Sequence, residues 1–103
     1  MSEADTQAQI LNWAKEHPEK IPCLFRVNCG LFRTFSGNIA RGADAGTPDL
    51  IGFLPGGRMI ALEVKSQKGR FSAEQTAWRK KAIEAGVLVL APRSLAALVS
   101  ALQ

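Results

Sequence analysis

Two carboxylates and one amine stand near the ends of two apolar segments in the middle of the chain. Asp49 opens the segment 49–54, and Glu63 and Lys65 close the segment 58–65. Carboxylate oxygens suit Mg²⁺, which typically takes one or two of them together with water and phosphate oxygens. A lysine beside such a pair can orient the nucleophile and stabilise the charge of the transition state. These residue types predict a metal-dependent site that hydrolyses phosphodiesters, provided that the fold brings them together.

The turn between the two segments decides whether the acids meet. Residues 55–57, Pro-Gly-Gly, are typical of a tight hairpin turn. With three residues in the turn, Asp49 stands opposite Glu63, on the same face and with Cβ atoms about 5 Å apart. Opposed like charges destabilise a sheet, and a cation between them removes that cost. The alternative is an ordinary surface, with Asp49 as a turn residue and Glu63 and Lys65 as an exposed ion pair.

The other predicted elements build a sheet around this hairpin. Ser2 can cap a first helix that ends before Pro18, and Ser72 with Gln75 has the spacing of a capping box. The order of elements predicts an α/β class, a mixed sheet with helices packed on its faces, in a single domain over residues 1–103. Helices are expected over 2–17, 72–85 and 94–102, strands over 22–28, 31–35, 49–54, 58–65 and 87–90, and a loop over 36–48.

Composition narrows the class of protein. The formal net charge of +4 and the pI near 9.5 favour a polyanionic partner such as nucleic acid. Cys23 and Cys29 lack the spacing of a zinc site and are expected to be reduced thiols. The polar, acidic start is no secretory signal, and no apolar run could cross a membrane, so a cytoplasmic protein is expected. A phosphate-binding loop of the G-x-x-x-x-G-K-[ST] kind is absent, which argues against a nucleotide cofactor.

Several motifs resemble those of one nuclease family. Pro48-Asp49 followed by Glu63-Val64-Lys65 is similar to the PD-(D/E)xK nuclease motif. The first helix and longer strings resemble the VRR-NUC family along nearly the whole chain. The strings are GTPDL (46–50), ALEVKSQKGRFSAEQTAW (61–78), AGVLVLAPRS (85–94) and the N-x-G of Asn28 to Gly30. The short chain is similar to the stand-alone phage or bacterial form.

The resemblance implies a restriction-endonuclease-like fold and DNA cleavage that depends on Mg²⁺ or Mn²⁺. It implies Asp49, Glu63 and the backbone carbonyl of Val64 as metal ligands, with Lys65 as the catalytic lysine. It also implies a metal-binding acid on the first helix, for which Glu3 fits best and Asp5 is the alternative. Stand-alone members resemble homodimers that act on branched DNA such as four-way (Holliday) junctions, so DNA and a second copy are the expected partners.

Three polar residues beyond the motif are candidates for the same site. Gln75 matches the glutamine of the family string and could touch the site or the DNA, although its capping box with Ser72 already explains it. Lys68 and Arg70 follow the catalytic strand, where they could position DNA by its phosphates or belong to a solvated loop.

Two other functions stay open on the sequence alone. The same basic fold could hold nucleic acid without cutting it, or it could hydrolyse RNA. The apolar segment 94–102 could form either a dimer interface or part of the core.

Overall fold

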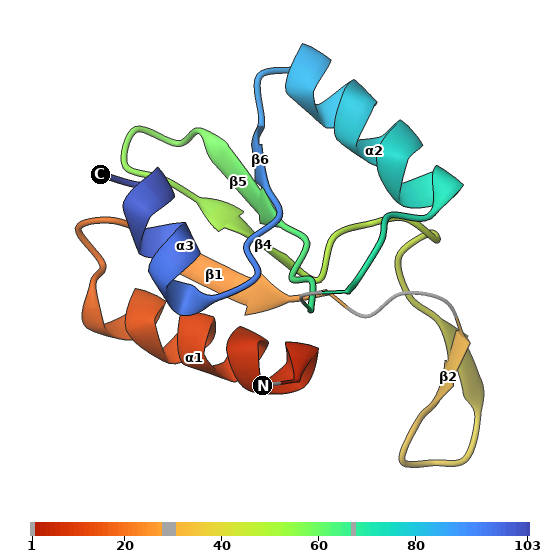
Figure 1. The fold of residues 1–103 in the computed structure, drawn as a ribbon. Coiled ribbons are helices and arrows are strands. Elements are labelled where there is room, and N and C mark those ends of the chain that lie inside the picture. Colours follow the sequence, from red (N-terminus) through yellow and green to blue (C-terminus); the bar gives the residue numbers. More distant parts are fainter. Residues whose placement is uncertain (1, 28–30, 67) are drawn as a thin grey trace.

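The computed structural model describes residues 2–27, 31–66 and 68–103, which form one mixed sheet, three helices and a separate two-stranded hairpin (Figure 1). The four-stranded sheet has the order β1-β4-β5-β6, in which β5 and β6 are parallel and the other neighbours antiparallel. This confirms the predicted α/β class. The elements are α1 (Glu3–Glu16), β1 (Cys23–Arg26), β2 (Leu31–Arg33), β3 (Ile39–Arg41), β4 (Leu50–Phe53), β5 (Met59–Leu62), α2 (Ala73–Glu84), β6 (Leu88–Leu90) and α3 (Leu95–Ala101).

The β4–β5 hairpin has the predicted register. Leu50 pairs with Leu62, and Phe53 pairs with Met59, so the next position along sets Asp49 opposite Glu63. The strand itself is shorter than predicted, because β5 ends at Leu62 rather than at residue 65. Beyond Leu62, the main-chain N–H of Val64 donates to the carboxylate of Asp49 instead of to a main-chain carbonyl of β4. The main-chain pairing between β4 and β5 therefore stops at Leu62.

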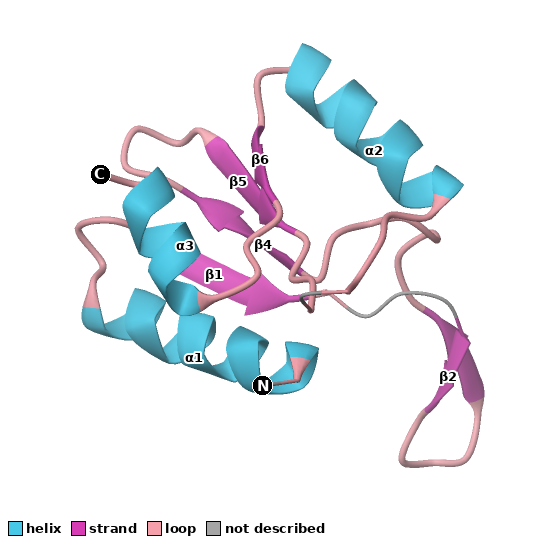
Figure 2. Ribbon diagram, viewed as in Figure 1, coloured by secondary structure: helices cyan, strands magenta, loops and turns pink. Residues whose placement is uncertain are grey.

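The core lies on one face of this sheet, under α1 and α3 (Figure 2). Ile10 and Leu98 of the two helices and Ile60 and Leu62 of β5 are fully buried together. Because Leu98 is buried and Leu95 packs against the same cluster, α3 belongs to the core. The apolar C-terminal segment is therefore explained by packing within the chain.

The predicted cap at Ser2 and the predicted capping box of Ser72 with Gln75 are both present. Ser2 accepts from the N–H of Asp5 at the start of α1, and Ser72 accepts from the N–H of Gln75 at the start of α2. The α2 helix ends before Gly86, whose φ of 94° suits a residue without Cβ. The caps fix where α1 and α2 begin, and both beginnings lie near the end of β5 that carries the candidate site.

The prediction of a loop over 36–48 is wrong in part. Residues 39–41 form β3, which pairs with β2 as a hairpin that projects away from the body of the molecule (Figure 1). The three-residue strand lies between Gly37 and Gly42, and glycine-rich surroundings predict a loop. The predicted N-x-G turn of residues 28–30 lies outside the described residues. No helix in the described ranges is long and apolar enough to cross a membrane.

Candidate active site

The two acids of the β4–β5 hairpin meet at its open end. The side chain of Asp49 accepts from the main-chain N–H of Val64 at 3.0 Å, and its own carbonyl accepts from the N–H of Val27 at 2.8 Å. Asp49 thus joins three segments of chain: it follows the loop before β4, its main chain extends the pairing with β1, and its side chain continues the contact with the β5 strand. Glu63 is 3% exposed. A buried carboxylate beside a second carboxylate is a costly arrangement without a cation or a proton.

The protonation of Glu63 reflects that cost. Its pKa is raised from 4.5 to about 8, first by burial and then by the negative charge of Asp49 and a hydrogen bond with that carboxyl group. Lys65 opposes the rise, and the charge of Glu3 adds a smaller increase. At neutral pH and without a metal ion, the proton on Glu63 supplies the positive charge that two adjacent acids require.

Gln75 joins Glu63 to Lys65. Its Nε2 donates to Oε1 of Glu63 at 3.1 Å, and its Oε1 accepts from Nζ of Lys65 at 3.0 Å and from the main-chain N–H of Ser72 at 2.9 Å. The capping box and the contact with the site were alternatives on the sequence, and one side chain makes both. The start of α2 therefore holds the lysine and the acid in fixed positions relative to each other.

Glu3, and not Asp5, reaches across from α1. Oε2 of Glu3 accepts from the main-chain N–H of Ser66 at 3.2 Å, directly after Lys65. Asp5 is exposed, and its carboxylate accepts from the main-chain N–H of Ser2 in the capping box. The geometry thus separates the two acids of the first turn: Asp5 caps the helix, whereas Glu3 lies beside the site.

Hard oxygen ligands are available for a divalent cation. In an extended segment the N–H and C=O of one residue point to the same side, so the carbonyl of Val64 is directed toward the side of Asp49, to which its N–H donates. In the described part of the chain, no three His, Cys, Asp or Glu side chains form a group of metal-ligand spacing. Two carboxylates, from Asp49 and Glu63, with one carbonyl match the small protein ligand set of Mg²⁺. The role of Glu3 as a ligand stays a prediction.

Lys68 and Arg70 lie on the loop between β5 and α2, and both are exposed. Arg93, which follows β6, donates to the carbonyls of Ser66 and Gly69 and so fixes this loop. The two cations are presented to solvent next to Lys65, and their contact with DNA stays a prediction. Arg93 lies within the string 85–94, but its contact with a loop some 25 residues earlier could not be read from the sequence.

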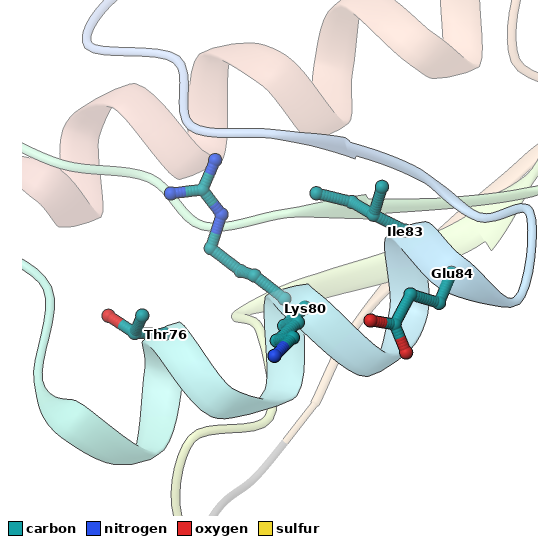
Figure 3. Close-up of a pocket in the computed structure, with 5 residues that line it drawn as sticks. Thr76, Lys80, Ile83 and Glu84 are labelled. Carbon is teal, nitrogen blue, oxygen red and sulfur yellow. The ribbon is translucent and has the colours of Figure 1, made fainter.

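A second group that the sequence did not reveal surrounds Phe71. The ring lies 5.3 Å from Nζ of Lys65 and 4.3 Å from the guanidinium carbon of Arg79. Nε of Arg79 is buried and has no hydrogen-bond partner among the described residues. A shallow cavity of about 390 Å³, open to solvent, lies along α2 (Figure 3), and it is lined by Thr76, Arg79, Lys80, Ile83 and Glu84. None of the acids of the site lines this cavity.

Comparison with known proteins identifies the family of the chain. The family model of the VRR-NUC domain matches residues 1–94, which include every element from α1 to β6 and all the site residues described above. Searches of curated proteins and of solved structures gave no match. Since the family model covers nine-tenths of the chain, the chain belongs to the VRR-NUC domain family and is a nuclease that binds nucleic acid.

Proposed function

We propose that this nuclease is a DNA endonuclease that depends on Mg²⁺ or Mn²⁺ and cuts branched DNA such as a four-way junction. One observation carries the proposal. Asp49 and Glu63 are opposed at the end of the β4–β5 hairpin, and Gln75 links Glu63 to Lys65. Without a metal ion, the buried Glu63 keeps a proton beside the half-buried Asp49. A divalent cation can replace that proton, because it supplies the positive charge that the two acids require.

Each side chain then has a separate task. Asp49, Glu63 and the Val64 carbonyl would hold the ion, which supplies positive charge that activates water and offsets the charge on the phosphate. Lys65 lies close enough to this group to orient the attacking water or to stabilise the phosphorane-like charge through its ammonium. Gln75 keeps Lys65 beside Glu63, and the N–H of Ser66 holds Glu3 near both. Positioning of this kind accounts for a large part of the rate of such reactions.

The finer part of the proposal concerns substrate shape and assembly. A four-way junction has two strands to cut, and a two-fold homodimer supplies two sites. Phe25 and Phe53 support such an assembly, because both are about half exposed on one face of the sheet and offer apolar surface for a contact. Light scattering of the purified chain measures the mass directly. A monomer at micromolar concentration contradicts the homodimer and leaves the chemistry of the site unaffected.

The function is tested by cleavage of labelled substrates. Linear duplex, flap, four-way junction and RNA are incubated with Mg²⁺, with Mn²⁺ or with EDTA. The proposal expects cutting of the junction with either metal and none with EDTA. Cutting of RNA alone, or cutting that persists in EDTA, contradicts it. Binding of all substrates without any cutting shows instead a module that holds nucleic acid.

Substitution of the site residues assigns the roles. Lys65→Met keeps the length of the buried side chain and removes its charge, and it is expected to slow cleavage by about 10²- to 10³-fold while DNA binding is retained. Lys15→Met, on the exposed surface near the far end of α1, is the control. Asp49→Asn and Glu63→Gln are expected to weaken binding of Mn²⁺ in calorimetry. Cleavage by Lys65→Met at the wild-type rate would contradict the role of Lys65. An unchanged Mn²⁺ titration in both acid variants would contradict the metal site.

A further inference from the structure

The β2–β3 hairpin, called the arm below, comprises residues 31–41. It leaves the body at the end of the sheet that carries the site (Figure 1). The segment that contains it begins just after Val27, whose N–H donates to the carbonyl of Asp49, and it returns to the sheet at Asp49 itself. The arm is thus inserted between two residues that are joined at the site, so whatever it binds lies close to the carboxylates.

The returning end of the arm is held against α2. A Cβ on Gly46, where φ is 92°, would lie 2.4 Å from the carbonyl oxygen of Glu74. The loop after the arm therefore packs against the first turn of α2 with no room for a side chain. That first turn also contains Gln75, which contacts Glu63 and Lys65. The loop that returns from the arm and the site thus share contacts with the same turn of α2.

The arm is basic. Residues 21–43 contain three arginines, at positions 26, 33 and 41, and no aspartate or glutamate. The register pairs Arg33 with Ile39 and Arg41 with Leu31, so both arginines lie on one face as diagonal neighbours, about 7–8 Å apart at Cα. Both are exposed. A ridge with this charge is suited to a polyanion and not to a second copy of a chain whose net charge is +4.

The tip of the arm presents an aromatic ring to solvent. Phe35 is fully exposed, at 114% of the reference area. The turn around it is fixed by main-chain hydrogen bonds from Thr34 to Asn38 at 2.8 Å and from Gly37 to Thr34 at 3.0 Å, and Arg33 donates to the carbonyl of Gly37. These hydrogen bonds define the turn that places the ring in solvent. An exposed aromatic ring between arginines matches the way proteins stack on unpaired bases or wedge between base steps.

We propose that the arm is a second nucleic-acid contact, in which Arg33 and Arg41 bind phosphates and Phe35 stacks on a base that is unpaired or distorted. This deepens the proposed function, since the arm would bring such a position of the substrate to the carboxylates. An aromatic tip gains most where bases are already unstacked, because the cost of opening a duplex step is then absent. The arm accordingly selects branched or gapped nucleic acid over an intact duplex.

Binding is measured by fluorescence anisotropy with a four-way junction and a linear duplex of equal length, in EDTA, over a range of NaCl concentrations. Arg33→Ala/Arg41→Ala is expected to weaken binding to both and to reduce the slope of log K against log salt by about 1.8. Lys15→Ala/Lys20→Ala removes the same charge from the last turn of α1 and the segment that follows it, and is expected to change the slope far less. Phe35→Ala is expected to weaken junction binding about tenfold with an unchanged slope, and Phe35→Trp to retain it.

A base analogue gives a local readout. With 2-aminopurine at the centre of the junction, the wild type and Phe35→Trp are expected to change its fluorescence, and Phe35→Ala is not. Arm variants that bind the junction as the wild type does would contradict the proposal. So would arm variants that change the particle mass in light scattering while DNA affinity stays constant, because the arm would then contact a second copy. Cleavage of the junction by the wild type with Mg²⁺ tests the nuclease separately. If the wild type cuts the junction and the arm variants bind it as tightly as the wild type, only the proposed role of the arm is refuted.

Discussion

The site end of the sheet and the arm are adjacent in the chain and opposite in physical character. At the site end, Glu63 and Lys65 are buried and held by side-chain hydrogen bonds to Gln75. On the arm, Phe35 and Ile39 are exposed, and the described contacts of the tip are within the hairpin itself. At the site end a cation can replace the proton of the buried Glu63. On the arm, the exposed side chains offer surface to a large ligand. We expect the stability of the fold to depend on the sheet and its site end, and the binding of nucleic acid to depend on the arm.

The largest expected effect is in the body of the sheet. A Cβ at Gly52 of β4 would lie 1.9 Å from the carbonyl oxygen of Cys23 on β1, so Gly52→Ala forces the two strands apart. We expect a loss of about 3 kcal/mol in the free energy of unfolding, measured by urea denaturation. Gly37→Ala on the arm is the matched change, because a Cβ there meets nothing within 4 Å and only the positive φ of 86° is unfavourable. Its expected cost is about 1 kcal/mol. Equal losses of unfolding free energy in Gly52→Ala and Gly37→Ala would contradict the contrast between the packed sheet and the exposed arm.

The next effect is the dependence of stability on pH. Glu63 titrates near 4.5 when unfolded and at about 8 when folded, so between these values the folded state holds an extra proton. The free energy of unfolding must therefore fall as the pH rises through this window, by up to about 1.4 kcal/mol per pH unit. Urea unfolding in EDTA at pH 5.5, 7 and 8.5 measures this loss, which levels off above the folded pKa of about 8. Glu63→Gln is expected to flatten this pH dependence, and a variant with the wild-type slope would show that another group is responsible.

A smaller effect separates the two roles of Gln75. Gln75→Glu keeps a residue that can complete the capping box with Ser72, but it removes the amide that donates to Glu63. Gln75→Ala removes both. We expect both variants to slow cleavage, on the order of tenfold, because the contact that holds Glu63 in a fixed position relative to Lys65 is lost. Only Gln75→Ala is expected to lose about 1 kcal/mol of stability through the cap. Normal cleavage by Gln75→Glu would leave Gln75 as a capping residue alone.

The smallest expected effect is at the tip of the arm. Phe35→Ala removes a ring that packs against nothing in the described structure, so the free energy of unfolding should change by less than about 0.5 kcal/mol. The same urea series measures it, with Phe53→Ala as the control, because that ring is only 46% exposed on the sheet. A loss above 1 kcal/mol for Phe35→Ala would mean that the arm packs against the body.

Much of the site could be predicted because its central geometry is local. The turn of residues 55–57 and the alternation of strand side chains set Asp49 opposite Glu63, and the structure has that register. The helix starts could be predicted for the same reason, since a capping box spans only four residues. The returning strand of the arm, β3, was expected as part of a loop, because a three-residue strand between glycines carries too little periodicity to be recognised.

What the sequence by itself determined is the set of chemical groups and the contacts between residues near one another along the chain: the acid pair, the lysine on the same strand and the caps of α1 and α2. Only the tertiary structure decided that Glu3 rather than Asp5 lies beside the site, by a hydrogen bond to Ser66 across 63 positions. It also decided the raised pKa of Glu63 and the link from Gln75 to Lys65. The physical reason is that burial and contacts between distant segments depend on packing of the whole chain, which no short motif contains.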